Sequence, residues 1–168
     1  GYFLRYCPVC DGFEHTGKTL GIVGSGGSVA RHALFLQTFS NKIHIFLHGE
    51  KSDSLGNYQQ RLCGSGIVWH EPRIAKILEG AREEGETEYS GRGVCLEDGS
   101  EIELAVLYGA LGCDLRLEPV AHLPLNKDED GYLITDVNCE TSIRGIYAAG
   151  DVTSQINQIS VAFGQGAI

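Results

Sequence analysis

The chain has 168 residues, of which 42% are hydrophobic and 21% charged, as is ordinary for a globular protein. At this length roughly 70% of the unfolded surface can be buried, enough for one domain and part of another. The formal net charge of -9 disfavours nucleic acid as a partner. No apolar run approaches the ~18 residues of a membrane span, so we expect a cytoplasmic protein with no membrane partner.

An α/β unit is predicted for the first part of the chain, where short apolar strands flank a helix. Residues 19–23 are an apolar strand bounded by glycines, and the apolar residues from Ser28 to Thr38 fit an amphipathic helix. Ile43, Ile45 and Leu47 alternate as a second strand. Together they predict a β-α-β unit with a right-handed crossover.

The elements that follow complete a Rossmann-like domain with a parallel sheet. A polar helix is predicted over residues 54–62, and residues 67–69 return to the sheet. Residues 94–104 are predicted to form a β-hairpin, in which Asp98-Gly99 supplies the tight turn. The next apolar strand is predicted over residues 105–111.

A glycine-rich loop follows the first strand of this unit. Gly24, Gly26, Gly27 and Ser28 stand where a phosphate loop would let the backbone approach a pyrophosphate at the helix N-terminus. The strand-to-helix context favours a dinucleotide site over a glycine-rich turn without a ligand. The last position of the fingerprint is Val29, where Gly or Ala normally permits close packing.

The segment after the second strand bears on the choice of nucleotide. It reads His48-Gly49-Glu50-Lys51, with no arginine to hold a 2′-phosphate. Glu50 would accept a hydrogen bond from the ribose 2′-hydroxyl and would repel a phosphate. The alternative is a solvated loop glutamate. We therefore expect NAD(P)H as cofactor, with a weak preference for NADH.

A redox-active dithiol is the favoured interpretation of Cys7 and Cys10, which are separated by two residues. This spacing lets the pair close a small disulfide, and a Cys-x-x-Cys thiol commonly has a depressed pKa. Asp11 could carry the proton of the exchange. The alternatives are half a zinc site and a non-functional pair. The remaining cysteines are expected to be inert packing residues: Cys63, Cys95, Cys113 and Cys139.

Three separate motifs together resemble the thioredoxin reductase family of FAD-dependent pyridine nucleotide-disulfide oxidoreductases, of the low-molecular-weight type. Cys7–Phe13 resembles the redox centre, Ala33–Leu36 the first helix of the nicotinamide domain, and Thr141–Val152 the second flavin signature. The resemblance implies that Cys10 faces the flavin, that Cys7 attacks the substrate disulfide, and that Asp11 is the acid–base group.

The resemblance also assigns flavin-binding residues near the end of the chain. Gly150 and Asp151 would bind the ribityl or phosphate region of FAD, and Gln158, at the start of the last helix, would lie beside the isoalloxazine ring. The alternative for Asp151 is a turn or helix-capping aspartate. Asn157 stands where these reductases often have arginine, so contacts at that position differ.

The resemblance divides the chain into a nicotinamide-binding domain, residues 1–109, and the C-terminal segment of a discontinuous FAD-binding domain, residues 110–168. The first half of that FAD domain has no counterpart, so we expect part of a longer protein that binds FAD only when complete. The uncovered faces of such a piece predict that it is disordered, forms a homodimer or depends on a partner chain. A domain rotation with a hinge near Arg5 and Gly109 is implied.

We therefore expect part of an NAD(P)H-dependent disulfide reductase, inactive alone, whose complete form reduces a thioredoxin-like protein. A relative acting on small disulfides is one alternative, since Pro8, Val9 and Glu14 depart from the usual residues of the family. A non-catalytic nucleotide-binding module is the other.

Overall fold

The computed structural model describes residues 3–81, 90–153 and 156–168. The chain divides into two compact units, residues 1–112 and residues 113–168. None of the described helices is both long and apolar enough to cross a membrane.

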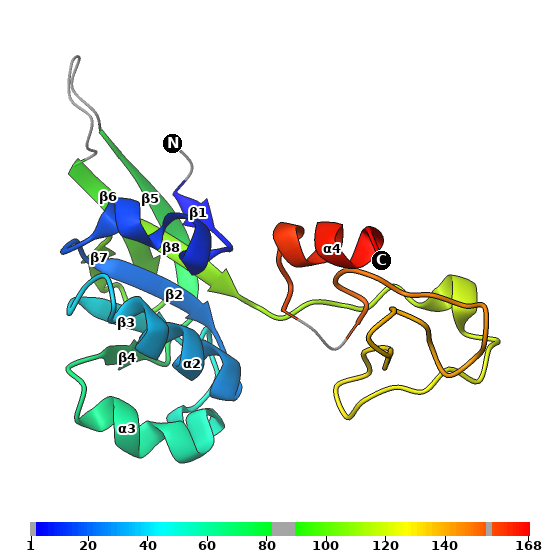
Figure 1. The fold of residues 1–168 in the computed structure, drawn as a ribbon. Helices are drawn as coiled ribbons and strands as arrows, with labels where there is room; N and C mark the ends of the chain where they lie inside the picture. Colours follow the sequence, from blue (N-terminus) through cyan, green and yellow to red (C-terminus); the bar gives the residue numbers. More distant parts are fainter. Residues whose placement is uncertain (1–2, 82–89, 154–155) are drawn as a thin grey trace. The chain divides into compact units, whose positions relative to one another are not determined.

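A five-stranded parallel sheet forms the centre of the first unit (Figure 1). All four strands predicted for this sheet are present, and a short N-terminal strand joins its edge. In spatial order the sheet contains β1 (Leu4–Arg5), β8 (Val106–Ala110), β2 (Leu20–Gly24), β3 (Ile43–Phe46) and β4 (Val68–His70). The predicted α/β fold class is confirmed.

The helix that follows β2 covers one face of the sheet. Helix α2 (Gly26–Leu36) begins two residues before the predicted start, because the loop glycines already belong to its first turn. Its buried positions Val29, Ala30, Ala33 and Leu36 recur at helical spacing and pack on Leu20 and Ile22 of β2. This packing fixes the helix N-terminus at the end of β2.

The single polar helix predicted over residues 54–62 is wrong. The segment forms a 3₁₀ helix, η2 (Ser52–Tyr58), and then a short α-helix, α3 (Gln59–Cys63). The break occurs at Gly56, whose φ of 55° lies in the left-handed region that glycine adopts without strain. Leu55 and Leu62, one on each side of the break, are both buried in the core below α2.

An antiparallel sheet covers the opposite face. It contains β5 (Ile74–Ala81), β6 (Ser90–Leu96) and β7 (Glu101–Glu103), and the predicted turn at Asp98-Gly99 joins the last two. Three apolar side chains from β6 and from the residue after β7 pack against Val23 of β2 and Phe46 of β3: Val94, Leu96 and Leu104. Alternate residues of β2 thus face different layers, and the unit has three of them.

The second unit contains little regular structure. It consists of a 3₁₀ turn, η3 (Glu118–Val120), of isolated bridges, and of helix α4 (Ile159–Gly166), which begins directly after Gln158 as predicted. Leu133, Cys139 and Thr153 are buried. Ile159 and Phe163 of α4 are each 77% exposed, so this helix presents an uncovered apolar face.

Candidate functional site

The two cysteines of the Cys-x-x-Cys motif form a disulfide. Cys7 is the N-cap of the four-residue helix α1 (Pro8–Asp11), and the amide of Cys10 donates to the carbonyl oxygen of Cys7 over 2.9 Å. This turn brings the two Cα atoms to 5.3 Å, within the range that a disulfide spans. Pro8 suits the first helical position, where no amide hydrogen is needed. Cys10 is exposed and Cys7 is partly buried.

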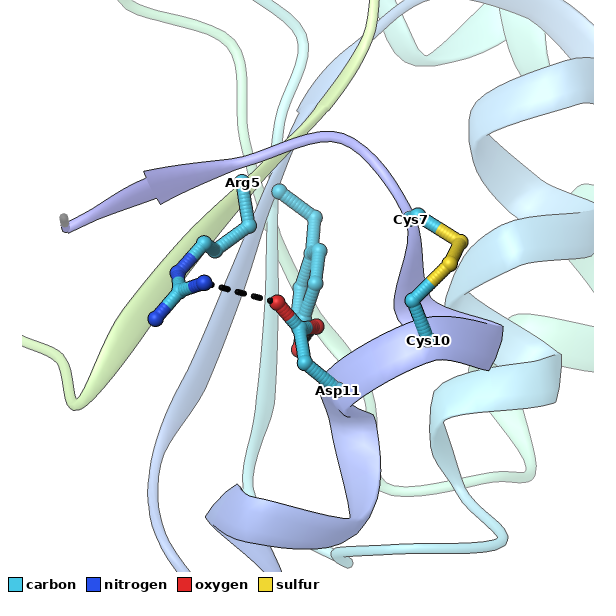
Figure 2. The surroundings of a disulfide bond; sticks show 5 residues. Arg5, Cys7, Cys10 and Asp11 are labelled. Carbon is cyan, nitrogen blue, oxygen red and sulfur yellow. Dashed lines mark hydrogen bonds and ion pairs between the residues drawn. A yellow bond between two sulfur atoms is a disulfide. The ribbon is translucent and has the colours of Figure 1, made fainter. Parts of the chain in front are cut away.

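Asp11, the residue after Cys10, accepts hydrogen bonds from two side chains of the sheet. The Tyr108 hydroxyl donates to Oδ1 over 2.7 Å, and Nη1 of Arg5 lies 3.2 Å from Oδ2. The Asp11 and Arg5 side chains are 14% and 31% exposed. Figure 2 shows the carboxylate directed toward Arg5 and away from the disulfide.

The two donors are neighbours on adjacent strands, because Arg5 of β1 pairs with Tyr108 of β8. Burial, and next its hydrogen bond to Asp11, raise the pKa of Tyr108 far above its usual value, so the hydroxyl remains a donor at neutral pH. Neither partner belongs to a motif of the sequence, so neither was predicted. Five residues lie between Arg5 and Asp11, and Tyr108 belongs to the last strand of the sheet, so no local pattern joins the three.

His15 lies near the same carboxylate. Burial lowers the pKa of its imidazole, although Asp11 acts in the opposite sense. Neither ring nitrogen has a hydrogen-bond partner among the described residues. His15 is therefore neutral at pH 7 and contributes no charge beside Asp11.

Two of the four predicted phosphate-loop residues, Gly24 and Ser28, line a cavity of about 450 Å³ at the carboxyl ends of the parallel strands, whereas Gly26 and Gly27 are not among its lining residues. The chain leaves β2 toward β3 on one side, while β8 occupies the other, so the cavity lies at a topological switch point, where such sheets bind ligands. Its lining comprises Gly24, Ser25, Ser28, Leu47, His48, Glu50, Arg73, Ala110, Leu111 and Gly112.

Two glycines of the loop are required by its geometry. Gly26 has a φ of +66°, and a Cβ atom at Gly24 would overlap the carbonyl oxygen of Ala110. A Cβ atom at Gly27 would come to 3.2 Å from the Tyr58 ring, which also favours a small residue there. Val29, the departure from the fingerprint, is fully buried in the core of the helix layer. The loop therefore keeps the close backbone approach that a pyrophosphate needs.

Glu50 lines the same cavity, as it must if its carboxylate accepts a hydrogen bond from the ribose. Its amide donates to the Leu47 carbonyl oxygen over 3.0 Å, which holds the loop after β3 in a turn. Glu71, from the end of β4, fastens this loop by accepting from the Ser52 amide over 2.9 Å and from Lys51 over 3.1 Å. Both contacts lower the pKa of Glu71, with the Ser52 amide as the larger cause.

The cavity also contains a cation, Arg73, that the sequence motifs did not predict. Arg73 lies across Gly49, where a Cβ atom would come within 2.8 Å of Arg73 Nε. The tetrapeptide after β3 indeed lacks arginine, but pairing of β3 with β4 brings Arg73 beside it. Consecutive parallel strands usually lie side by side, and this rule could have predicted that Arg73, after β4, lies near the segment after β3.

In the second unit, Asp151 and Gln158 line a separate cavity of about 480 Å³ together with Asn157, Ile159, Ala162 and Phe163. Gly150, with a φ of +80°, precedes Asp151, and its amide donates to Oε1 of Gln165 over 2.7 Å. Nε2 of Gln165 donates to the Thr153 hydroxyl, and that hydroxyl donates to the Gly150 carbonyl oxygen. Gln165 thus fastens the Gly150 turn to α4.

The burial expected for the single cysteines is wrong at two positions. Cys63 and Cys113 are exposed, Cys95 is partly buried, and only Cys139 is buried among these four. Cys63 ends α3 and Cys113 starts the second unit, so both lie where elements end. Among the described residues no group of three or more His, Cys, Asp or Glu side chains is arranged to hold a metal ion.

Comparison with known proteins matches nearly the whole chain to one family. The family model described as pyridine nucleotide-disulphide oxidoreductase matches residues 1–166. A thioredoxin reductase of Mycoplasma genitalium is 33% identical over 99% of the chain and 53% of its own length. One of Mycoplasma pneumoniae is 30% identical over 100% and 53%.

The fold is similar to that of solved structures of the same group. The thioredoxin reductase of Streptococcus pyogenes superposes with a TM-score of 0.80 at 25% identity, covering 98% of the chain and 54% of that structure. The chain therefore spans about half the length of the relatives it matches.

Proposed function

The chain belongs to the pyridine nucleotide-disulphide oxidoreductase family. On that premise we propose that it is part of a reductase that passes electrons from NAD(P)H through FAD to the Cys7–Cys10 disulfide. The dithiol would then reduce a disulfide on a thioredoxin-like protein. The observation that carries the proposal is the combination in one unit of a disulfide at an exposed turn and a glycine-lined cavity at the switch point of the sheet.

In this proposal the residues divide between two binding domains. Residues 1–109 are the nicotinamide-binding domain, and Gly24, Gly26, Gly27 and Ser28 bind the pyrophosphate at the N-terminus of α2. The close approach of Gly24 to Ala110 fits this assignment, because a side chain there would close the cradle.

Residues 110–168 are the C-terminal segment of the FAD-binding domain. Gly150 and Asp151 would bind the ribityl or phosphate region, and Gln158 would lie beside the flavin ring. The Gln165 contact that holds the Gly150 turn supports this assignment, since it orients Asp151 at the cavity. When bound, the two cofactors supply a hydride and a relay for the electron pair.

The chain's own residues perform the disulfide exchange in this proposal. Cys10 faces the flavin side and Cys7 attacks the substrate, so that a mixed disulfide forms at Cys7 and is resolved by Cys10. Asp11 is the acid–base group of the exchange. In sum, the substrate disulfide gains two electrons and two protons, supplied by one NAD(P)H and one proton from solvent.

A preference for NADH over NADPH is part of the proposal, because Glu50 lines the nucleotide cavity. Arg73, which lines the same cavity, would attract the 2′-phosphate of NADPH, so we expect the preference for NADH to be modest.

The proposed dithiol suits a reducing compartment, which favours the cytoplasm. A homodimer is also proposed, and sedimentation of the chain would test it.

Replacement of single cysteines in the full-length protein tests the proposed reaction. Cys7→Ser and Cys10→Ser should each abolish NAD(P)H-dependent reduction of thioredoxin, followed with insulin as final acceptor. Cys63→Ser is the matched control, since Cys63 is exposed and lies outside the disulfide. Retained activity in both variants would favour a non-catalytic module. Activity toward small disulfides but not toward thioredoxin would identify the other substrate class.

The visible spectrum of the purified 168-residue chain tests its relation to FAD. Oxidised flavins absorb near ~450 nm. We expect a colourless chain that binds nicotinamide nucleotides, because the proposal places only part of the flavin site in it. A flavin band would contradict the proposed dependence on a further segment.

A further inference from the structure

The short helix that carries the disulfide is held to the sheet at both ends. Its N-cap, Cys7, follows β1 with only Tyr6 between, and its last residue, Asp11, bonds Arg5 of β1 and Tyr108 of β8. Figure 2 shows the Asp11 carboxylate directed toward Arg5, on the far side of the turn from the sulfur atoms. The contact thus ties the helix to the strands instead of reaching the disulfide.

Such a tie matters because the helix is too short to be stable alone. Helix α1 has 4 residues, whereas isolated helices shorter than ~12 residues are marginal in water. The bonds to Asp11 come from a fully buried tyrosine and a partly buried arginine, and these two are paired across adjacent strands. The rigid sheet therefore determines where the end of the helix lies, and Cys10 is the residue before that end.

We propose that Arg5 and Tyr108 are positioning residues, which act through Asp11 to hold Cys10 at bonding distance from Cys7 in the dithiol. This inference rests on the proposed function in one respect, that the Cys7–Cys10 pair is redox-active. Its consequence is a shift in the equilibrium between the dithiol and the disulfide of Cys7 and Cys10. A preorganised pair of thiols has a high effective concentration toward each other, which favours the disulfide over the dithiol.

Exchange with glutathione measures this equilibrium. The two thiols lose two electrons and two protons as the Sγ–Sγ bond forms, and one glutathione disulfide gains them to give two glutathione molecules. The fraction of oxidised chain at each glutathione ratio, fixed by acid quench and thiol alkylation, gives the equilibrium constant. The 168-residue chain is used as it stands, without flavin or nicotinamide.

Tyr108→Phe is the central variant, because it removes one hydroxyl and no charge. We expect the equilibrium constant for disulfide formation to fall about three- to tenfold, the effect of one lost hydrogen bond on a group that it orients. Tyr6→Phe is the matched control: Tyr6 is 71% exposed and should leave the constant unchanged. Arg5→Met should lower the equilibrium constant by a similar factor. Arg5→Lys, which keeps the positive charge, should lower it much less.

A double-variant cycle shows whether Tyr108 acts through Asp11. In an Asp11→Ala background, Tyr108→Phe should produce no further fall, whereas an independent structural role would add its full effect. Circular dichroism of each variant checks that the fold is retained. If Tyr108→Phe does not fold, Arg5→Met against Arg5→Lys gives the same test at an edge strand.

Equal constants for Tyr108→Phe and Tyr6→Phe, or additive effects with Asp11→Ala, would overturn the inference. So would a change confined to the exchange rate, since a proton carrier alters rates and leaves equilibria unchanged. That last outcome would leave the proposed acid–base role of Asp11 intact. Conversely, loss of the proposed reductase activity in the full-length protein would not affect the glutathione equilibrium, so the two failures are distinguishable.

Discussion

The imidazole rings of His44 and His70 stack in parallel on neighbouring strands, with Nδ1 of His44 2.9 Å from Nε2 of His70. One ring must donate and the other accept, which requires that at least one of them be neutral. The Phe46 ring stacks beside both. Burial lowers the pKa of each histidine, and His70 further lowers that of His44, while Asp98 acts on His70 in the opposite sense.

Acid should therefore destabilise the first unit. Since both pKa values are lower in the folded chain than the unperturbed ~6.5, the unfolded state binds more protons below that pH. The free energy of unfolding should fall by on the order of 1 kcal/mol between pH 7 and pH 5.5 on account of this pair. Urea unfolding at the two pH values measures it. His44→Asn should reduce the dependence.

Gly24→Ala should distort the junction of β2 and β8. The added methyl group would overlap the Ala110 carbonyl oxygen, so the strands must shift, at a cost of about 1–3 kcal/mol in the free energy of unfolding. Thermal unfolding and NADH titration measure the two consequences. Gly64→Ala is the matched control, because nothing lies within 4 Å of its new Cβ atom and its φ is negative. Equal stability of the two variants would contradict the close approach.

Glu50→Gln should shift nucleotide preference toward NADPH. Removal of the carboxylate from the cavity leaves Arg73 as a cation there, so NADPH should gain roughly three- to tenfold over NADH, as for a partly screened charge contact. Fluorescence titration with both nucleotides at one ionic strength measures the ratio. Glu79→Gln, at an exposed position on β5, is the control. An unchanged ratio would show that Glu50 does not contact the ribose.

Gln165→Leu should loosen the turn at Gly150. The variant loses the bond from the Gly150 amide and the bond to the Thr153 hydroxyl, at a cost of about 1–3 kcal/mol for the second unit. Hydrogen exchange at the Gly150 amide reports it directly. Glu129→Ala, exposed in the same unit, should leave that exchange rate unchanged. Undiminished protection in Gln165→Leu would show that another group holds the turn.

The sequence predicted those parts of the fold in which burial is periodic. Strands β2 and β3 and helix α2 are buried on regular faces, and their apolar residues recur accordingly. Strand β5 was not predicted individually, because six of its eight residues are exposed and it shows little alternation. Helix α3 was merged with η2, because a polar segment does not reveal that Gly56 leaves the helical region.

The candidate site divides in the same way. The sequence predicted the disulfide pair and the glycine loop, because each of these motifs spans only a few consecutive residues. The contacts of Asp11 and Gly49 were not foreseen, since Tyr108 and Arg73 reach them through strand pairing. Side-chain burial at the ends of elements, as for Cys63, also depends on packing that periodicity does not describe.

Strand β8 holds two contacts of the candidate site at a fixed spacing within its five residues. Tyr108 faces the helix layer and bonds Asp11, Leu107 faces the antiparallel sheet, and Ala110 closes the strand beside Gly24. A slip of one residue would exchange the two faces, because side chains alternate along a strand. It would remove the tyrosine from its bond to Asp11 and, together with that, displace the wall of the cavity beside Gly24. Insertions and deletions in β8 should therefore be tolerated far less than substitutions.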